Sequence, residues 1–232
     1  MFEITSFFLF IISPLCFFIV AIINIINDPH YRLNQIFFGA FTGLTLTFLF
    51  LGFYLLPDVN ILNIPIDISV FIGLFCLTVG TAFFALSALY LEHGALKNQN
   101  LQLFFITIMT IFAMLSSYIM AFTDETEIVF FVGFISLCIT IYSNDTFLVI
   151  ILYRIIKSLE DTKVKKKIKW YLVSYIFYNV VAPLGFALTV ILPEGDIYKP
   201  IPAVIGSILC SLVFLRSFLI STAEKQDITS QG

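Results

Sequence analysis

Seven apolar stretches, each long enough to cross a lipid bilayer, take up most of this chain of 232 residues. A membrane-spanning α-helix needs ~20 predominantly apolar residues. Backbone groups inside hydrocarbon must satisfy their own hydrogen bonds, so we expect these stretches to be helices. They cover approximately residues 5–27, 34–56, 68–91, 101–122, 128–153, 168–192 and 201–222. The sequence therefore predicts an all-α polytopic membrane bundle of seven transmembrane helices over residues 1–222, followed by a short cytoplasmic tail at 223–232.

The connections between these stretches are too short for a separate soluble domain. The chain is 60% hydrophobic and 12% charged, whereas ordinary soluble domains are ~25% charged. Helix-stopping residues stand at the breaks, among them Asp28, Pro29 and Pro65. No Lys or Arg precedes the first stretch. We therefore expect that stretch to be a retained span and not a cleaved signal peptide.

The basic residues predict the orientation of the bundle, because positively charged loops stay in the cytoplasm. Alternate connections on one side carry Arg32, Lys97, Arg154, Lys157, Lys163, Lys165, Lys166, Lys167, Lys169 and, in the tail, Lys225. The opposite side carries only Lys199. This bias predicts an outside N-terminus and a cytoplasmic C-terminus, which requires an odd number of spans. We expect the membrane to be the plasma membrane.

A basic segment precedes the sixth stretch and contains Lys163, Lys165, Lys166, Lys167 and Lys169. Trp170 and Tyr171 follow it directly, as is typical of the membrane interface. Such a cluster attracts anionic lipid headgroups, with each Lys contributing ~1 kcal/mol near the surface. The alternative interpretation is a docking surface for a cytoplasmic signalling protein.

Two ionisable residues lie well inside the apolar stretches, and both are candidate ligand or ion-pathway residues. Asp145 follows Asn144 in the fifth stretch, and Arg216 lies in the seventh. A charge at the bilayer centre costs at least ~2.5 kcal/mol. At ~1.5 Å per residue the two residues lie at similar depths, so we expect an ion pair or a shared polar network. The alternative is that Arg216 extends to the headgroups while Asp145 faces a wet crevice.

Polar and small residues mark two further stretches. Asn179 and Pro183 stand near the middle of the sixth, where Pro183 is expected to kink the helix. With neighbouring tyrosines they would line a small ligand pocket or form a hinge, or Asn179 would bond across helices. Gly39 and Gly43 give the second stretch a GxxxG spacing, which suits a close helix contact inside the bundle or a homo-oligomer interface.

Several classes of protein are disfavoured by what the sequence lacks. The four cysteines fall singly in four apolar stretches, which predicts small core residues and not a disulfide framework. The seventh stretch has no lysine for a retinal Schiff base. His30 and His93 are the only histidines, which are too few for a metal centre built on several histidines. We expect no enzyme, no catalytic residue, no metal or cofactor, and no nucleic-acid partner.

Three segments carry a resemblance to a known family. Residues 27–38 combine Asn, Pro and Arg with an aromatic-rich helix start, residues 153–172 form a basic connection, and residues 192–200 form a polar loop. Their order resembles the seven-helix N-terminal sensor region of some prokaryotic histidine kinases. The kinase part of that family is absent from this sequence, so the resemblance implies a receptor-like module that signals through another protein. It transfers no catalytic residue.

These observations lead to three function hypotheses. The first is a receptor-like or sensory module that binds a small or lipidic ligand and signals through a separate cytoplasmic partner, with membrane lipids around it. The second is an ion or small-solute transporter or channel with Asp145 as the intramembrane site. The third is a structural subunit of a membrane complex, which the 28 phenylalanines would suit.

Overall fold

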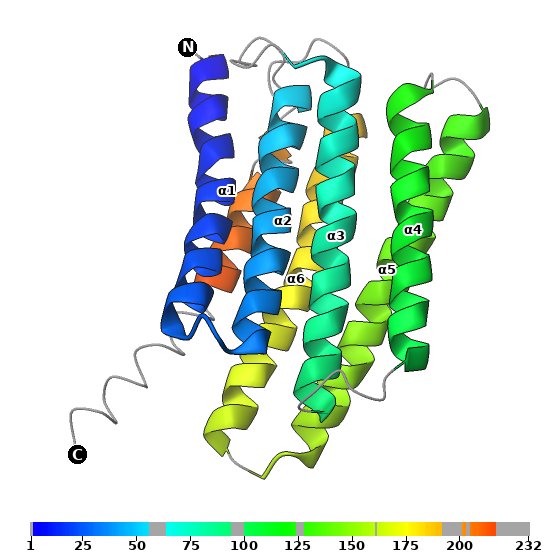
Figure 1. The fold of residues 1–232 in the computed structure, drawn as a ribbon. Helices are drawn as coiled ribbons and strands as arrows, with labels where there is room; N and C mark the ends of the chain where they lie inside the picture. Colours follow the sequence, from blue (N-terminus) through cyan, green and yellow to red (C-terminus); the bar gives the residue numbers. More distant parts are fainter. Residues whose placement is uncertain are drawn as a thin grey trace.

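The fold of the chain is entirely helical within the residues that the structure, a computed structural model, describes: 2–55, 64–93, 100–123, 128–160, 162–191, 201–202 and 205–216. Six helices are α1 (Phe2–Asn27), α2 (Arg32–Leu55), α3 (Ile66–His93), α4 (Asn100–Phe122), α5 (Ile128–Ser158) and α6 (Thr162–Ile191). A seventh, Ile205–Arg216, is here named the C-terminal helical segment. Successive helices run in opposite directions (Figure 1). The predicted tail at 223–232 lies outside the described residues.

The turn between α1 and α2 forms where the sequence predicts a break. Asp28 follows the last residue of α1, and its Oδ1 accepts hydrogen bonds from the backbone N–H groups of His30 at 3.0 Å and Tyr31 at 3.2 Å. These bonds satisfy backbone donors that the helix ends leave without partners. At the opposite end of the bundle, α3 begins directly after Pro65.

The helices α5 and α6 extend beyond the apolar stretches that predict them. The fifth stretch ends at residue 153, but α5 continues to Ser158. The sixth begins at 168, but α6 starts at Thr162 and includes the basic segment. Lysine and arginine are good helix formers, so the helices continue past the apolar region into the polar surroundings.

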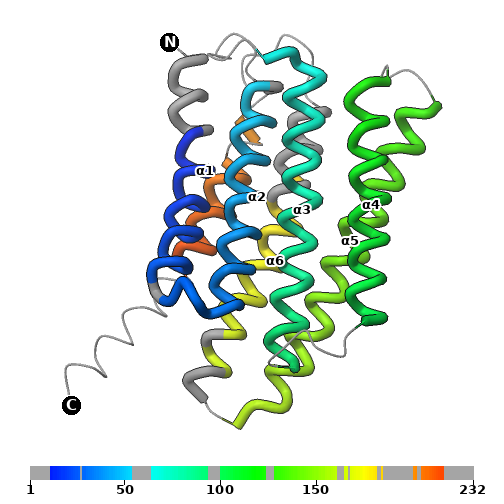
Figure 2. Tube along the Cα trace, viewed as in Figure 1, coloured from blue at the N-terminus to red at the C-terminus, as the bar shows by residue number. Residues whose placement is uncertain are grey.

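Two neighbouring groups of helices make up the bundle: α4 and α5 form one, and the other helices form the second (Figures 1 and 2). α2 packs between α1 and α3, and α5 contacts α3, α4 and α6. In Figures 1 and 2 the first three helices stand in a row, with α6 and the C-terminal helical segment behind them and α4 and α5 at the side. α5 crosses the bundle obliquely, from beside α4 at one end to below α3 at the other. This oblique path brings the middle of α5 into the interior.

Glycines allow α2 and α3 to approach closely. A Cβ atom added at Gly43 would lie 2.9 Å from the Cα of Gly80 and 3.0 Å from the carbonyl oxygen of Cys76. Gly39, one turn earlier, faces the ring of Phe83. The GxxxG spacing therefore serves a contact inside the chain, which was one of the two roles it predicts.

An aromatic cluster fills the centre of the bundle. Phe214 of the C-terminal helical segment is fully buried. Its ring contacts five aromatic rings from four other helices, with centroids 5.4 to 6.5 Å away: Phe17, Phe41, Phe84, Tyr171 and Tyr178. Aromatic pairs at these separations attract one another beyond the effect of burial alone. The C-terminal helical segment is therefore a core element.

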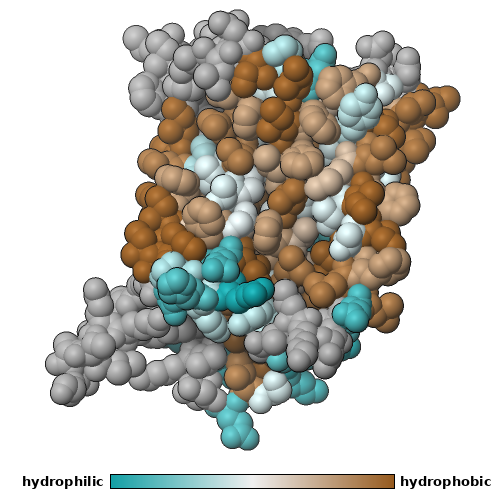
Figure 3. Space-filling view, in the orientation of Figure 1, coloured by the Kyte–Doolittle hydropathy of each residue, from teal (hydrophilic) through white to brown (hydrophobic). Residues whose placement is uncertain are grey.

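The outer surface has the character of a membrane protein. Among the described residues, four helices are long and apolar enough to cross a membrane: Arg32–Phe53 within α2, and all of α3, α4 and α5. Their outer faces expose many large hydrophobic side chains, for example Phe112 and Phe131. Figure 3 shows hydrophobic residues over the middle of the visible face and hydrophilic ones toward its lower end. Such a surface is stable in lipid and not in water.

Candidate functional site

A buried hydrogen bond joins the middle of α5 to the middle of α6. The hydroxyl group of Tyr175 donates to Oδ1 of Asp145. The two helices are antiparallel, and Asp145 lies as many residues before Ser158 as Tyr175 lies after Thr162. Tyr175 is fully buried and Asp145 is 4% exposed, so the bond is shielded from the surroundings. It is a charge-assisted bond whenever the carboxyl group is ionised.

Two buried oxygen atoms of adjacent residues have no hydrogen-bond partner among the described residues. They are Oδ2 of Asp145 and Oδ1 of Asn144. Both residues are buried, with Asn144 only 2% exposed. Most buried polar atoms in proteins are hydrogen-bonded, and unpaired ones raise the free energy of the folded state. Each of these two oxygen atoms is therefore an acceptor without a donor.

The predicted ion pair between Asp145 and Arg216 is absent. Arg216 is exposed, and its guanidinium carbon lies 5.6 Å from the centroid of the Trp170 ring. Similar depth along the helices favours a pair, but depth does not determine which way a side chain points around its helix. Asp145 points toward α6 and the core, whereas Arg216 lies on the outer face of its own helix. Arg216 instead makes a cation–π contact near the basic end of the bundle.

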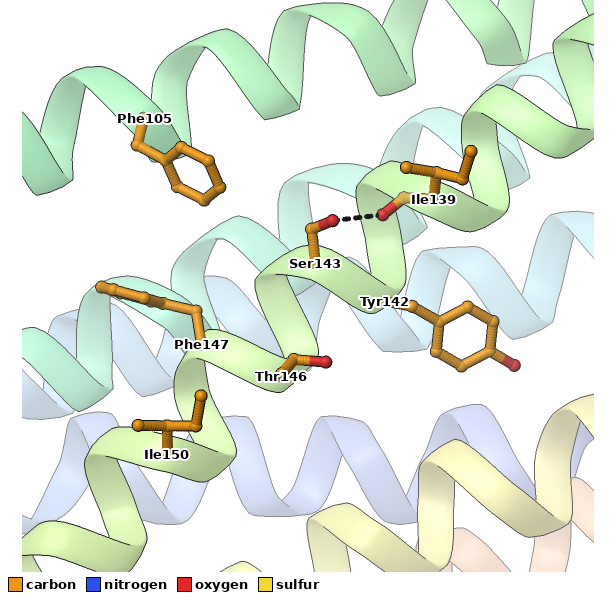
Figure 4. A pocket seen from close by; sticks show the side chains of 7 residues that line it. All are labelled: Phe105, Ile139, Tyr142, Ser143, Thr146, Phe147 and Ile150. Atoms are coloured by element: carbon orange, nitrogen blue, oxygen red, sulfur yellow. Dashed lines mark hydrogen bonds between the residues drawn. The ribbon is translucent and has the colours of Figure 1, made fainter.

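The polar run from Tyr142 to Thr146 divides between two faces of α5. Asn144 and Asp145 point into the bundle. Tyr142, Ser143 and Thr146 line a shallow groove of about 530 Å³ between α4 and α5, together with Phe105, Ile139, Phe147 and Ile150. Figure 4 shows these residues, with the Ser143 hydroxyl group donating to the carbonyl oxygen of Ile139 at 2.6 Å. Most of the groove therefore lies on a different face of α5 from the buried carboxyl group, with Tyr142, three residues before Asp145, at the boundary (Figure 4).

Serine and tyrosine side chains link further helices around the site. Ser87 of α3 and Tyr171 of α6 have their hydroxyl oxygens 3.3 Å apart. The hydroxyl group of Ser174 lies 3.4 Å from the carbonyl oxygen of Val213 in the C-terminal helical segment. The sequence pattern does not predict these contacts. Isolated serines in apolar helices are the available signal, because they bond across helices or back to their own helix.

The remaining candidate residues lie apart from the buried carboxyl group or at its edge. Asn179 is half-buried, one helical turn beyond Tyr175. The side chain of Pro183 lies outside the described residues, although α6 is helical through this position. The kink at this position stays a prediction.

The basic segment is only partly described. Lys165 donates to the carbonyl oxygen of Leu159 at 3.2 Å, whereas Lys166 and Lys169 are exposed. The side chains of Lys163 and Lys167 lie outside the described residues. The segment lies at the end of the bundle where α5 leads into α6, far from the acidic Asp67 at the start of α3 (Figure 1).

Metal-binding geometry is not found in the part of the chain that the structure describes: no group of three or more His, Cys, Asp or Glu residues is arranged to hold an ion. His93 lies 3.3 Å from its neighbour Glu92.

No protein-family model matches the chain. No curated protein matches it either. The arrangement of the site is therefore the main guide to its function.

Proposed function

We propose that the chain is a seven-helix transmembrane module that binds a small or lipidic ligand within the bundle and signals through a separate cytoplasmic partner. Its N-terminus lies outside the plasma membrane and its C-terminus in the cytoplasm. The distribution of charge supports this orientation, because the exposed cations Arg32, Arg154, Lys157, Lys166 and Lys169 all belong to the end where α1 meets α2 and α5 meets α6.

The observation that carries the proposal is the incomplete hydrogen bonding of Asp145. One carboxyl oxygen accepts from Tyr175 and the other has no partner, next to the unpaired amide oxygen of Asn144. A ligand that carries hydroxyl or amino groups supplies the missing donors. Binding then gains both the new bonds and relief from the cost of unpaired buried acceptors.

The same hydrogen bond gives the site a route to the cytoplasmic side. A ligand that competes for Asp145 weakens the bond from Tyr175 and changes how α6 sits against α5. From Tyr175, α6 is helical through Lys169 and Lys165, ~9 and ~15 Å away at ~1.5 Å per residue. A shift of α6 at Tyr175 therefore moves the basic segment that we assign to partner binding.

Amine-reactive crosslinking of the tagged full chain in its native membrane tests the proposal. Mass spectrometry should recover a soluble signalling protein joined to the lysines at 163–169. The yield should change in Tyr175→Phe, which removes the donor to Asp145, and should not change in Ser143→Ala. Ser143 is a suitable control because it lies on the groove face of α5 and its hydroxyl group donates to Ile139 of its own helix.

Two outcomes of this experiment contradict a signalling role. One is the absence of any soluble protein crosslinked to the basic segment. The other is an equal yield from the native chain and from Tyr175→Phe, with both proteins folded and present at the same level in the membrane.

The unpaired oxygens also favour a second candidate function, that of a cation transporter or channel. Asp145 and Asn144 offer the acceptor oxygens that a desolvated cation requires. Cation flux into vesicles that contain the purified chain, abolished by Asp145→Asn and retained by Ser143→Ala, would favour transport over signalling.

A further inference from the structure

A surface at the basic end of α6 combines cations with an aromatic ring. Arg216 lies over the ring of Trp170 at 5.6 Å. Lys169 is the neighbour of Trp170, and Lys166 stands one helical turn before it; both are exposed, as is Arg216. Among the described residues, no carboxylate forms a salt bridge with any of these three cations. The surface is therefore a concentration of unpaired positive charge.

Each of the two helices that form this surface also carries a row of exposed apolar residues next to its cations, here called its apolar stripe. On α6 the stripe after Lys169 consists of Val173, Ile176, Val180 and Leu184. On the C-terminal helical segment the stripe that leads to Arg216 consists of Ile205, Leu209 and Leu212. The residues recur at spacings of three and four, so each set lies along one face of its helix.

The two helices are in contact, with their cations at the same end. Ser174 of α6 approaches the carbonyl oxygen of Val213, and the rings of Tyr178 and Phe214 lie 6.1 Å apart. The helices are antiparallel, so Lys169 near the start of α6 meets Arg216 at the end of the C-terminal helical segment. The contact between Arg216 and Trp170 joins the basic ends of the two stripes.

The lengths of the stripes match one leaflet of a membrane. At ~1.5 Å per residue, Ile205 to Arg216 spans ~16 Å and Lys169 to Leu184 spans ~22 Å. The hydrocarbon core is ~30 Å thick, so one leaflet contributes ~15 Å. An apolar face of this length that ends in cations beside a tryptophan matches the polarity of a single anionic lipid, in which a charged headgroup follows apolar acyl chains.

We propose that Arg216, Trp170, Lys169 and Lys166 form a binding site for the phosphate headgroup of an anionic phospholipid, with its acyl chains along the two apolar stripes. The cation–π contact holds the Arg216 guanidinium group beside Trp170. A guanidinium group binds phosphate with two parallel hydrogen bonds, which lysine does not reproduce. The inference rests on the membrane placement of these helices and not on the receptor role.

The single tryptophan of the sequence provides a direct assay, because all tryptophan fluorescence comes from Trp170. The purified full chain is placed in phosphatidylcholine vesicles in which one lipid carries bromine on its acyl chains, which quenches nearby tryptophan. Brominated phosphatidylglycerol is compared with the same fraction of brominated phosphatidylcholine. A bound anionic lipid should give a relative association constant of about fivefold or more in favour of phosphatidylglycerol, since one cation near the surface contributes about that factor.

Substitutions distinguish a defined site from general attraction to charge. Arg216→Ala should lower the preference for phosphatidylglycerol about fivefold, and Arg216→Lys should lower it less, because the charge remains without the paired hydrogen bonds. Arg154→Ala should leave it unchanged; Arg154 is an exposed cation at the same end of the bundle, on α5. Retention of the native thermal unfolding midpoint by each variant shows that the bundle is intact.

Three results would overturn the proposal. The first is equal quenching by the two brominated lipids in the native chain. The second is an equal loss of the preference for phosphatidylglycerol in Arg216→Ala and Arg154→Ala. The third is complete loss of that preference in millimolar inorganic phosphate. The second would indicate diffuse attraction, and the third a site for free phosphate and not for a lipid.

Discussion

The contact between Gly43 and Gly80 allows a sharp test of how α2 and α3 pack. In Gly43→Ala the new Cβ meets backbone atoms at 2.9 and 3.0 Å, and a backbone cannot rotate away. Carbon atoms pack best at about 3.5 to 4.0 Å, so the helices must separate by roughly 0.6 Å or more. In Gly39→Ala the Cβ meets the Phe83 ring at 3.1 Å, which a small change of side-chain angle relieves.

The expected free energies follow from two opposing terms. Gly→Ala stabilises a helix by about 0.5 to 1 kcal/mol. Forcing atoms into a packed interface costs about 1 to 3 kcal/mol. For Gly43→Ala the steric term is larger, and we expect net destabilisation of about 1 to 2 kcal/mol. For Gly39→Ala the two terms nearly cancel.

Reversible unfolding of the detergent-solubilised chain, followed by circular dichroism, measures both free energies under the same conditions. The two variants make the same chemical change one turn apart in the same helix, so effects on the unfolded state are shared. Equal stability of Gly43→Ala and Gly39→Ala would show that the close approach of α2 to α3 does not limit the size of residue 43.

Three further outcomes are expected. Tyr175→Phe should lower the free energy of unfolding by about 1 to 2 kcal/mol in the native chain. In the Asp145→Leu background the same substitution should lower it by much less, because the hydrogen bond then has no acceptor. Equal effects in the two backgrounds, in the same unfolding assay, would exclude the coupling. Phe214→Ala should cost about 3 kcal/mol or more, whereas Leu212→Ala on the exposed face should change little; equal losses would contradict the central place of Phe214. The cysteine introduced by Asp67→Cys should react with a membrane-impermeant thiol reagent added outside intact cells. Labelling of this cysteine only after lysis would reverse the proposed orientation.

The helices were predictable from the sequence because their determinants are local. Hydrophobic length identified each helical region, and Asp28 with Pro29 identified the first turn. The ends of α5 and α6 were placed too close to the bilayer, because hydrophobicity measures where lipid ends and not where a helix ends. Lys157 and Lys165 belong to helices that continue beyond the apolar region.

The partner of Asp145 was missed because it depends on rotation about helix axes. Depth along the helices suggested Arg216, but the exposed positions Ile205, Leu209 and Leu212 show that Arg216 shares their outer face. The short connection between α5 and α6 is a better guide to the partner of Asp145. In an antiparallel pair, residues at equal distances from the connection are neighbours, and this rule applied to Asp145 indicates Tyr175.

The position of Phe214 has a consequence for biogenesis. Ribosomes make this chain from the N-terminus, so Phe17, Phe41 and Phe84 are synthesised long before the ring that they surround. Until the C-terminal helical segment is made, the aromatic cluster lacks its central ring, and Ser13 lacks Ser207, to which it donates a hydrogen bond at 2.9 Å. The core of the bundle is therefore completed only when the last described helix has been synthesised.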